Sequence, residues 1–370
     1  MGTNILVENI QEEASHFVRH LKSFRGQAVD LRVPVSMATA NVMCEILLGR
    51  RYNYHDPEFA ELIKTVLKFF KMLFTTSVVN YFPFLKYCPG DLFGAKFAKE
   101  CTSGLVKTFA QHYALHEREK KPAGRDKSKD KDNNNNDNMI AALLQEKKRK
   151  VNNGEETFLD EGNIVRTITD LFIASTETTS STLLWGILFL IRHPEVQENI
   201  YEELCREIGA DTAVRLQDRN KLPYINAVIM ETQRLANIVP LTMYTCAKST
   251  EVGGYVIPSG ASVLVSLDSV LMDTNLWGSD AKEFRPERFF NTEGKLCARK
   301  ELIPFSIGRR SCIGEAFAKM ELFLFLAILC QNFKFLPADS LPCQSPVFGL
   351  TQTPREFKVR VLSRNNASSE

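Results

Sequence analysis

Apolar residues recur at the spacing of an α-helix along most of the chain. Residues 4–25 mix apolar and charged positions at this spacing, which predicts an amphipathic helix. The same period, with Pro and Gly signals at several ends, predicts further helices at 35–48, 57–73, 92–119, 159–191, 194–208, 222–236 and 314–332. Residues 255–267 are rich in β-branched and apolar side chains around Pro258-Ser-Gly260, which predicts a β-hairpin. The whole pattern predicts a mainly α fold with a minor β-sheet.

Two segments stand out from this pattern. Residues 120–138 are dominated by Lys, Asp and Asn, with four Asn in a row, and cannot bury apolar surface. We therefore expect a flexible surface loop there, within a single domain that spans 1–370. The helix at 159–191 is long enough to cross a whole domain, yet its centre, 175–182, places hydroxyls and one carboxylate between apolar neighbours. A polar stretch in such a position suggests chemistry.

Composition excludes several classes of protein. The net charge of +2 does not suggest a nucleic-acid partner. The nine cysteines include no C-x-x-C pair, which argues against a zinc ribbon or a redox dithiol. The chain contains no G-x-G-x-x-G, P-loop or G-x-S-x-G motif, so any electrons that it needs should come from another protein. The pairs His16/His20 and His112/His116 lack the Glu of H-E-x-x-H, and we expect them on exposed helix surface.

The sharpest motif is Phe305-x-x-Gly308-x-Arg310-x-Cys312-x-Gly314. A thiolate is the metal-binding form of cysteine, and Cys312 comes just before a predicted helix, where unpaired backbone N–H groups favour an anion. Gly308 and Gly314 allow a flat cofactor to approach the backbone closely. Arg310 can neutralise a carboxylate such as a haem propionate, and Phe305 can shield the sulfur from water. The alternative is a buried structural cysteine beside a basic turn.

This segment resembles the haem-binding loop of the cytochrome P450 family. Three further segments resemble that family in its order: Ala174-Ser-Thr-Glu-Thr-Thr179, Glu231-Thr-Gln-Arg234 and Phe284-Arg-Pro-Glu-Arg-Phe289. The sequence around these motifs is most similar to that of the animal microsomal drug- and lipid-oxidising members. Relative to the family pattern, the chain lacks the membrane anchor, the first strands and the first helices. The resemblance therefore implies a cytochrome P450 domain that is incomplete at its N-terminus.

The resemblance implies roles for particular residues. Cys312 would be the axial ligand of the iron of haem b, and the other cofactor contacts would be Ala174, Phe305, Gly308, Arg310 and Gly314. Glu177 and Thr178 would deliver protons, and Ser175 stands where the family usually has Gly. The triad of Glu231, Arg234 and Arg288 would brace the loop before Cys312. Substrate would meet Ile173, Leu241, Thr242 and Leu350.

The function implied by the resemblance is a haem-thiolate monooxygenase that inserts one atom of O2 into a lipophilic small molecule, such as a xenobiotic, fatty acid or steroid. Electrons would come from an NADPH-dependent flavoprotein reductase, for which Arg309, Arg310 and Lys319 form a candidate docking patch. By family, the full-length form would lie at the cytoplasmic face of the endoplasmic reticulum membrane. Two alternatives remain open: a haem-thiolate isomerase or dehydratase, and an inactive shortened product that binds no haem.

Overall fold

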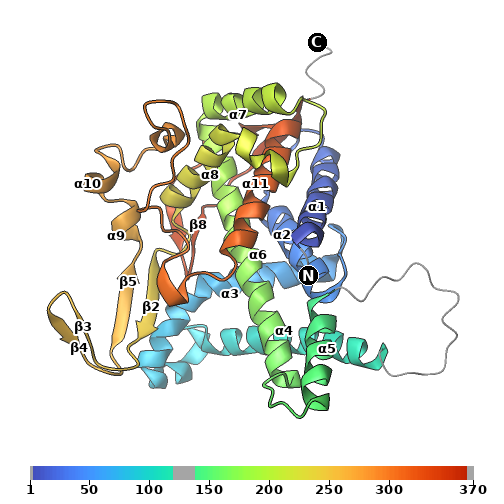
Figure 1. Ribbon diagram of the computed structural model, residues 1–370, viewed down its shortest axis with the longest axis vertical. Helices are drawn as coiled ribbons and strands as arrows, with labels where there is room; N and C mark the ends of the chain where they lie inside the picture. Colours follow the sequence, from blue (N-terminus) through green and yellow to red (C-terminus); the bar gives the residue numbers. More distant parts are fainter. Residues whose placement is uncertain (1–2, 120–137, 365–370) are drawn as a thin grey trace, which may run out of the picture.

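The computed structural model describes residues 3–119 and 138–364 and is mainly helical (Figure 1). The long and medium helices are α1 (Thr3–Ser23), α2 (Arg32–Leu48), α3 (Pro57–Tyr81), α4 (Ala95–Glu119), α5 (Met139–Asn152), α6 (Glu161–Arg192), α7 (Pro194–Glu207), α8 (Pro223–Ala236) and α11 (Glu315–Asn332), with short α9 (Asp268–Leu271) and α10 (Thr274–Trp277). The predicted mainly α fold with minor sheets is confirmed.

Helix α6 is the axis of the fold and passes through the middle of the molecule (Figure 1). Asp160 caps its first turn by accepting a hydrogen bond from the backbone N–H of Asn163 at 2.8 Å, and it ends at Arg192, before His193-Pro194. Its C-terminal half, 183–191, is buried throughout, and α2, α4, α8 and α11 pack around the helix. A helix that is apolar on every side needs such a complete cover, which explains its central position.

The strands in the described part of the chain form four small antiparallel sheets. One has the order β1 (Ala28–Val29), β9 (Val359–Ser363), β6 (Phe333–Pro337), and the other three are the pairs β2 (Leu241–Thr245) with β5 (Ser262–Ser266), β3 (Thr250–Val252) with β4 (Tyr255–Ile257), and β7 (Pro346–Phe348) with β8 (Gln352–Pro354). The β3–β4 hairpin projects from the body of the molecule (Figure 1). Phe333 and Phe335 of β6 and Val359 and Val361 of β9 are buried in the main core, which is otherwise mainly helical.

The predicted hairpin at 255–267 is wrong, although both of its strands exist. Strand β4 pairs with the preceding strand, β3, through a turn at Gly253 and Gly254, whose φ values of +57° and +83° suit a tight turn. Strand β5 pairs with β2, and the ladder continues as Gly260 N–H donates to the carbonyl of Cys246 at 2.7 Å. The turn after Pro258 therefore separates two sheets instead of joining two paired strands.

Helix boundaries also differ from the prediction. Helix α3 continues to Tyr81, beyond the predicted end at residue 73. Helix α5 and the C-terminal strands were not predicted. Asn138, the last residue of the expected loop, caps α5 by accepting a hydrogen bond from Ala141 N–H at 2.9 Å. The rest of that loop, residues 120–137, lies outside the described residues.

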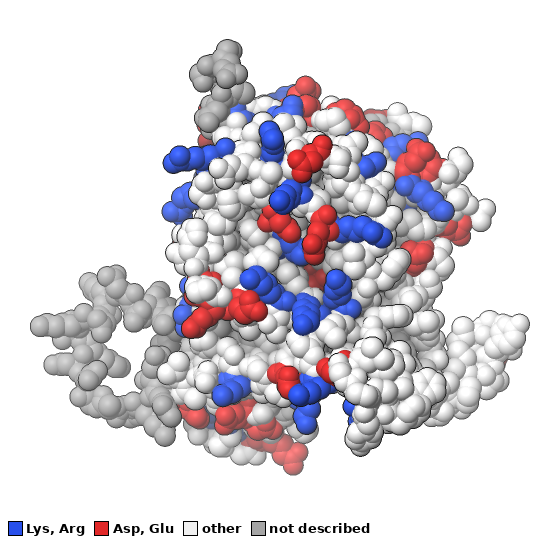
Figure 2. All heavy atoms as spheres, turned by 180° about the vertical axis from the view of Figure 1, so that it is seen from behind, with Lys and Arg blue, Asp and Glu red and all other residues white. Residues whose placement is uncertain are grey.

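The distribution of charge on the surface agrees with the near-equal numbers of basic and acidic residues in the sequence. Figure 2 shows acidic and basic side chains mixed over the face opposite to that of Figure 1. Of the helices that the structure describes, none combines the length and the apolar character that a bilayer crossing requires.

Candidate active site

The Cys312 loop, residues 305–314, is closed by its own backbone. The N–H of Cys312 donates to the carbonyl of Phe305 at 3.0 Å. Between them the chain passes through Ser306 and Gly308, with φ values of +61° and +82°, and a short turn at Gly308–Arg310. A positive φ is strained for side chains and free for glycine, which explains Gly308. Gly314 is the residue immediately before α11, so Cys312 stands at the amino end of that helix.

This position gives the cysteine an electropositive setting. The first-turn N–H groups of α11 are unpaired within the helix, and the helix dipole adds partial positive charge. Arg309 and Arg310 are exposed and make no ion pair with any described residue. Lys319, the third residue of the expected docking patch, is not a free cation. Its Nζ pairs with Glu315 at 2.6 Å and lies 5.6 Å from the centre of the Phe305 ring. The free cations beside the sulfur are therefore arginines.

The residues around Cys312 fit a haem. The thiol is exposed, and a soft thiolate suits iron. Ile307 and Ile313 beside it are 71% and 91% exposed. Ala174 is one of several exposed positions in the N-terminal part of α6. Exposed apolar side chains around a metal-binding thiol are what a large flat macrocycle would cover, at about 25 cal/mol per Å² of apolar area buried. Arg310 would reach a propionate, and Phe305 would cover the sulfur.

On β2, Tyr244 lies close to the same loop. The nearby hydroxyl groups of Thr242 and Ser306, together with the charge of Arg310, lower the pKa of the Tyr244 hydroxyl. Thr242 and Leu241 of the predicted substrate set are thus on the strand that faces the Cys312 loop.

Glu177 is the buried acid of the site. Its side chain, on α6, is 1% exposed. Atom Oε1 accepts hydrogen bonds from Thr351 Oγ1 at 2.8 Å and Ser181 Oγ at 3.0 Å, while Oε2 has no partner among the described residues. Burial raises the pKa of Glu177 to about 7, although the two hydroxyls act in the opposite direction. The carboxyl group can therefore both hold and release a proton near neutral pH.

Its neighbours on α6 direct their hydroxyls into the helix. Thr178 Oγ1 donates to the carbonyl of Ala174 at 2.7 Å, and Thr176 Oγ1 donates to that of Phe172 at 2.7 Å. Ser175, at the position where the family usually has Gly, donates to the same Phe172 carbonyl at 3.2 Å. Such bonds satisfy hydroxyls without an external partner. Helix α6 remains one continuous helix through this stretch.

A pocket of about 620 Å³ opens beside Glu177. Its walls come from α3, from α6 and from the β7–β8 hairpin, and include Leu67, Lys71, Met72, Glu177, Ser181 and Thr351. Of the predicted substrate residues, Ile173, Leu241 and Thr242 do not line it. Leu350 lies between the lining residues Gly349 and Thr351. The structure thus places Glu177, but not the predicted substrate set, at this pocket.

The tip of the β7–β8 hairpin is attached to α3. The N–H of Leu350 donates to the carbonyl of Phe70 at 3.1 Å, and a Cβ on Gly349 would come within 3.0 Å of Lys71 Cα. The next residue, Thr351, then reaches Glu177. Sequence reasoning missed both hydroxyl partners: Ser181 could have been found from its i+4 spacing on the helix, whereas Thr351 lies in a distant hairpin without a motif.

The predicted triad meets in the core. Glu231 of α8 accepts four hydrogen bonds: from Arg234 Nε at 2.7 Å, Arg234 Nη2 at 2.8 Å, Arg288 Nε at 2.8 Å and the backbone N–H of Arg285 at 3.0 Å. Both side chains of the Glu231–Arg234 pair are fully buried. Arg234 Nη1 also donates to the carbonyls of Leu271 and Ala281 at 2.9 and 2.7 Å. The triad fastens α8 to residues 271–288, upstream of the Cys312 loop, as a brace would.

We expect Glu231→Gln to destabilise the fold by about 3–5 kcal/mol, because it leaves two buried guanidiniums without their counter-charge. Glu146→Gln is the matched control, since Glu146 also pairs with an arginine three residues on, at 2.8 Å, but its partner Arg149 is 51% exposed. The control should cost less than about 1 kcal/mol. Urea unfolding of both variants measures the difference, and equal losses would contradict the brace.

Comparison with known proteins agrees with these features. The family model "Cytochrome P450" matches residues 2–361. Cytochrome P450 2U1 of Bos taurus is 37% identical over 89% of this chain, and cytochrome P450 2E1 of Mus musculus is 35% identical over 99%. Those alignments cover 59% and 72% of the two relatives, so the chain spans less than two thirds of the length of the 2U1 protein. With a family match over nearly its whole length, the chain belongs to the cytochrome P450 family.

Proposed function

We propose that this chain is a haem-thiolate monooxygenase acting on a lipophilic small molecule. The observation that carries the proposal is the exposed thiol of Cys312 at the amino end of α11, within a backbone-closed loop and beside uncovered apolar side chains. Haem b, when bound, supplies the binding and reductive cleavage of O2. Cys312 would hold the iron, and Arg310 would hold a propionate.

The buried acid supports oxygen chemistry over rearrangement. Cleavage of O2 consumes protons, which a site that excludes water must supply from its own groups. Glu177 can hold a proton near neutral pH, and its unpartnered Oε2 is available to a water or a donor group. Thr178 follows it on α6 and would present its hydroxyl once the bond to Ala174 opens. An isomerase or dehydratase that rearranges a peroxide needs no such proton supply.

Electrons would come from a separate flavoprotein reductase that uses NADPH, because the sequence contains no recognisable nicotinamide or flavin motif. The exposed Arg309 and Arg310 would attract an acidic partner to the side of the molecule that carries Cys312. The proposed location is the cytoplasmic face of the endoplasmic reticulum membrane.

A spectrum and a turnover assay together test this function. A reduced carbon-monoxide difference spectrum of the purified chain should show the shifted Soret band of thiolate-ligated haem, and its absence would favour an inactive product that binds no haem. Fatty-acid and drug-like substrates are then offered with reductase and NADPH, or with an organic peroxide alone. We expect hydroxylated product that depends on reductase. Rearranged peroxide formed without reductase would instead identify an isomerase or dehydratase.

A further inference from the structure

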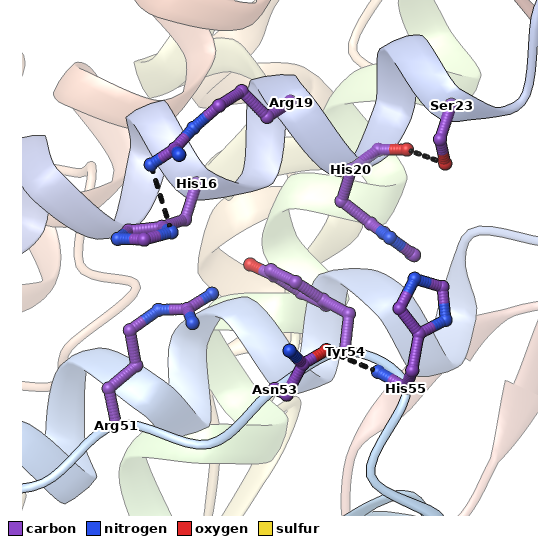
Figure 3. A pocket seen from close by; sticks show the side chains of 8 residues that line it. All are labelled: His16, Arg19, His20, Ser23, Arg51, Asn53, Tyr54 and His55. Atoms are coloured by element: carbon purple, nitrogen blue, oxygen red, sulfur yellow. Dashed lines mark hydrogen bonds between the residues drawn. The ribbon is translucent and has the colours of Figure 1, made fainter.

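A second pocket, of about 250 Å³, lies between α1 and the segment that joins α2 to α3 (Figure 3). It shares no lining residue with the Glu177 pocket or with the Cys312 loop. Its walls are unusually basic and aromatic and include His16, Arg19, His20, Arg51, Tyr54 and His55. The histidines of α1, expected on exposed surface, are in fact half-buried, and the fold brings His55 to them from another element.

Arg19 provides a positive charge that nothing nearby neutralises. No carboxylate of a described residue lies within ion-pair distance of its guanidinium. Its Nη2 is 3.0 Å from His16 Nδ1, and because a guanidinium can only donate, that nitrogen must accept. His16 is thereby held in the neutral tautomer with its proton on Nε2. Arg51, on the opposite wall, is bound to the buried Glu13, which Tyr54 also contacts.

His20 and His55 form the other end of the pocket. The His20 ring is stacked on Tyr54 with 4.4 Å between ring centres, and His55 meets it edge-on at 5.5 Å. Neither imidazole donates or accepts a hydrogen bond with a described residue through its ring nitrogens. Burial and the positive charges of His55 and Arg51 lower the pKa of His20 to about 4. At neutral pH the His20 imidazole is therefore neutral, and it would gain a proton if negative charge arrived.

We propose that this pocket binds a small tetrahedral oxyanion, either free phosphate or the phosphoryl group of a phosphate monoester. Arg19 and the imidazole of His20 would donate to it from α1, and the imidazole of His55 would donate from the opposite wall. The size suits a phosphoryl group with a small substituent. Two other carboxylates interact with residues of this pocket. Glu12 Oε1 is 3.8 Å from His16 Nε2, and Glu45 of α2 interacts electrostatically with Arg51. The carboxylate of Glu13 is already bonded to Asn41 and Arg51.

A transition metal is the competing ligand, since His16 and His20 are spaced i, i+4 on α1. Two observations disfavour it. The guanidiniums of Arg19 and Arg51 repel a cation, and one nitrogen of His16 is already used by Arg19. Within residues 3–119 and 138–364, moreover, no three His, Cys, Asp or Glu side chains are arranged to hold a metal. Electrostatics therefore favours an anion.

Binding should take up protons. An anion beside His20 opposes the positive charges that lower the pKa of this imidazole, so the pKa rises in the complex. The bound state then carries more protons than the free state, and affinity must increase as pH falls, by up to tenfold per pH unit for each proton gained. Sulfate has the same shape as phosphate but stays a dianion between pH 6 and pH 8, so its affinity reports the proton gained by the protein alone, whereas phosphate also changes its own charge in this range. Both probes distinguish this site from the haem site, which neither occupies.

Calorimetric titration of the full chain with inorganic phosphate at pH 6 and pH 8 tests the proposal. Two buffers of different ionisation enthalpy report the protons taken up, and glycerol phosphate tests whether an ester is accepted as well as free phosphate. We expect tighter binding at pH 6, with proton uptake. Arg19→Gln and His55→Gln, both at exposed side chains, should each weaken binding about tenfold or more. Lys22→Gln, also exposed and on α1 but outside the pocket, should change it less than twofold.

Three results would overturn the proposal: no heat with phosphate at millimolar concentration, binding that Arg19→Gln and His55→Gln leave unchanged, or Zn²⁺ binding at this pocket in preference to phosphate. Circular dichroism verifies that the variants are folded. The carbon-monoxide spectrum should be the same in all of them, so failure of the oxyanion site and failure of the proposed haem chemistry are read separately.

Discussion

Replacement of Cys312 by serine is expected to abolish the thiolate-type Soret band of the reduced carbon-monoxide complex and, with it, all reductase-dependent turnover. A thiolate is a good ligand for iron, and the amino end of α11 favours an anion, whereas a serine hydroxyl stays protonated at neutral pH and is a poor ligand for iron. Because the side chain is exposed and serine differs little from cysteine in shape, the variant should fold as the wild type does.

The matched control is Cys297→Ser, because Cys297 is also an exposed free thiol but lies outside the loop. It should leave the spectrum and the haem content per chain unchanged. Haem content and thermal unfolding are measured on both variants. An unaltered band in Cys312→Ser would remove the proposed iron ligand and the roles assigned to Phe305, Gly308 and Arg310.

The Cys312 loop could be predicted from sequence because everything it needs is local. Its closing hydrogen bond joins Phe305 to Cys312, and the helix that supplies the electropositive end begins after Gly314. All the described α-helices of more than four residues except α5 were predicted for the same reason, since helical hydrogen bonds connect residues four apart. The triad also had a local signal, the i, i+3 spacing of Glu231 and Arg234. Arg288 is 57 positions from Glu231 and reaches it only in the folded chain.

What the sequence could not provide is long-range pairing. Thr351 is 174 positions from Glu177, and no pattern marks it as the hydroxyl that holds the carboxyl group. The prediction of a hairpin at 255–267 was wrong for a similar reason. Composition identified both strands, but the partner of each strand is set by the turns at Gly253-Gly254 and after Pro258. His55 reaches His20 only because α3 follows a short segment that folds back over α1.

The structure explains the polar centre of α6 by hydrogen bonds within the helix. Most of its hydroxyls are satisfied by carbonyls one turn earlier, as with Thr178 and Thr182, so they add polarity without needing water. Glu177 differs from these hydroxyls, because its Oε1 accepts hydrogen bonds from two side chains. One of the two is Thr351 of the distant β7–β8 hairpin, and Oε2 has no partner among the described residues.

Glu177→Gln is expected to lower reductase-dependent product formation by about 10²-fold, because glutamine keeps the size of the side chain but cannot release a proton. The wild-type rate should fall as pH rises through about 7, since the buried carboxyl then loses the proton it is to donate. The variant should lose this pH dependence. Product formed per NADPH consumed is the measurement, and substrate binding by difference spectrum should change little.

The partners of Glu177 provide a sharper test than its removal. The hydroxyl of Thr351 lowers the pKa of Glu177, so Thr351→Val should raise it and move the fall in rate to higher pH. Thr353→Val lines the same pocket without a hydrogen bond to Glu177, and should leave the profile in place.

Stability separates this effect from unfolding. In the native state the pKa of Glu177 lies above its ordinary value, so the contribution of the protonated carboxyl to stability is complete at low pH and is lost as pH rises through about 7. Glutamine avoids that loss, and the variant should therefore be at least as stable as the wild type at pH 8. A variant that is inactive only because it unfolds would instead melt at lower temperature, and a wild-type rate independent of pH between 6 and 8 would exclude Glu177 as the proton donor.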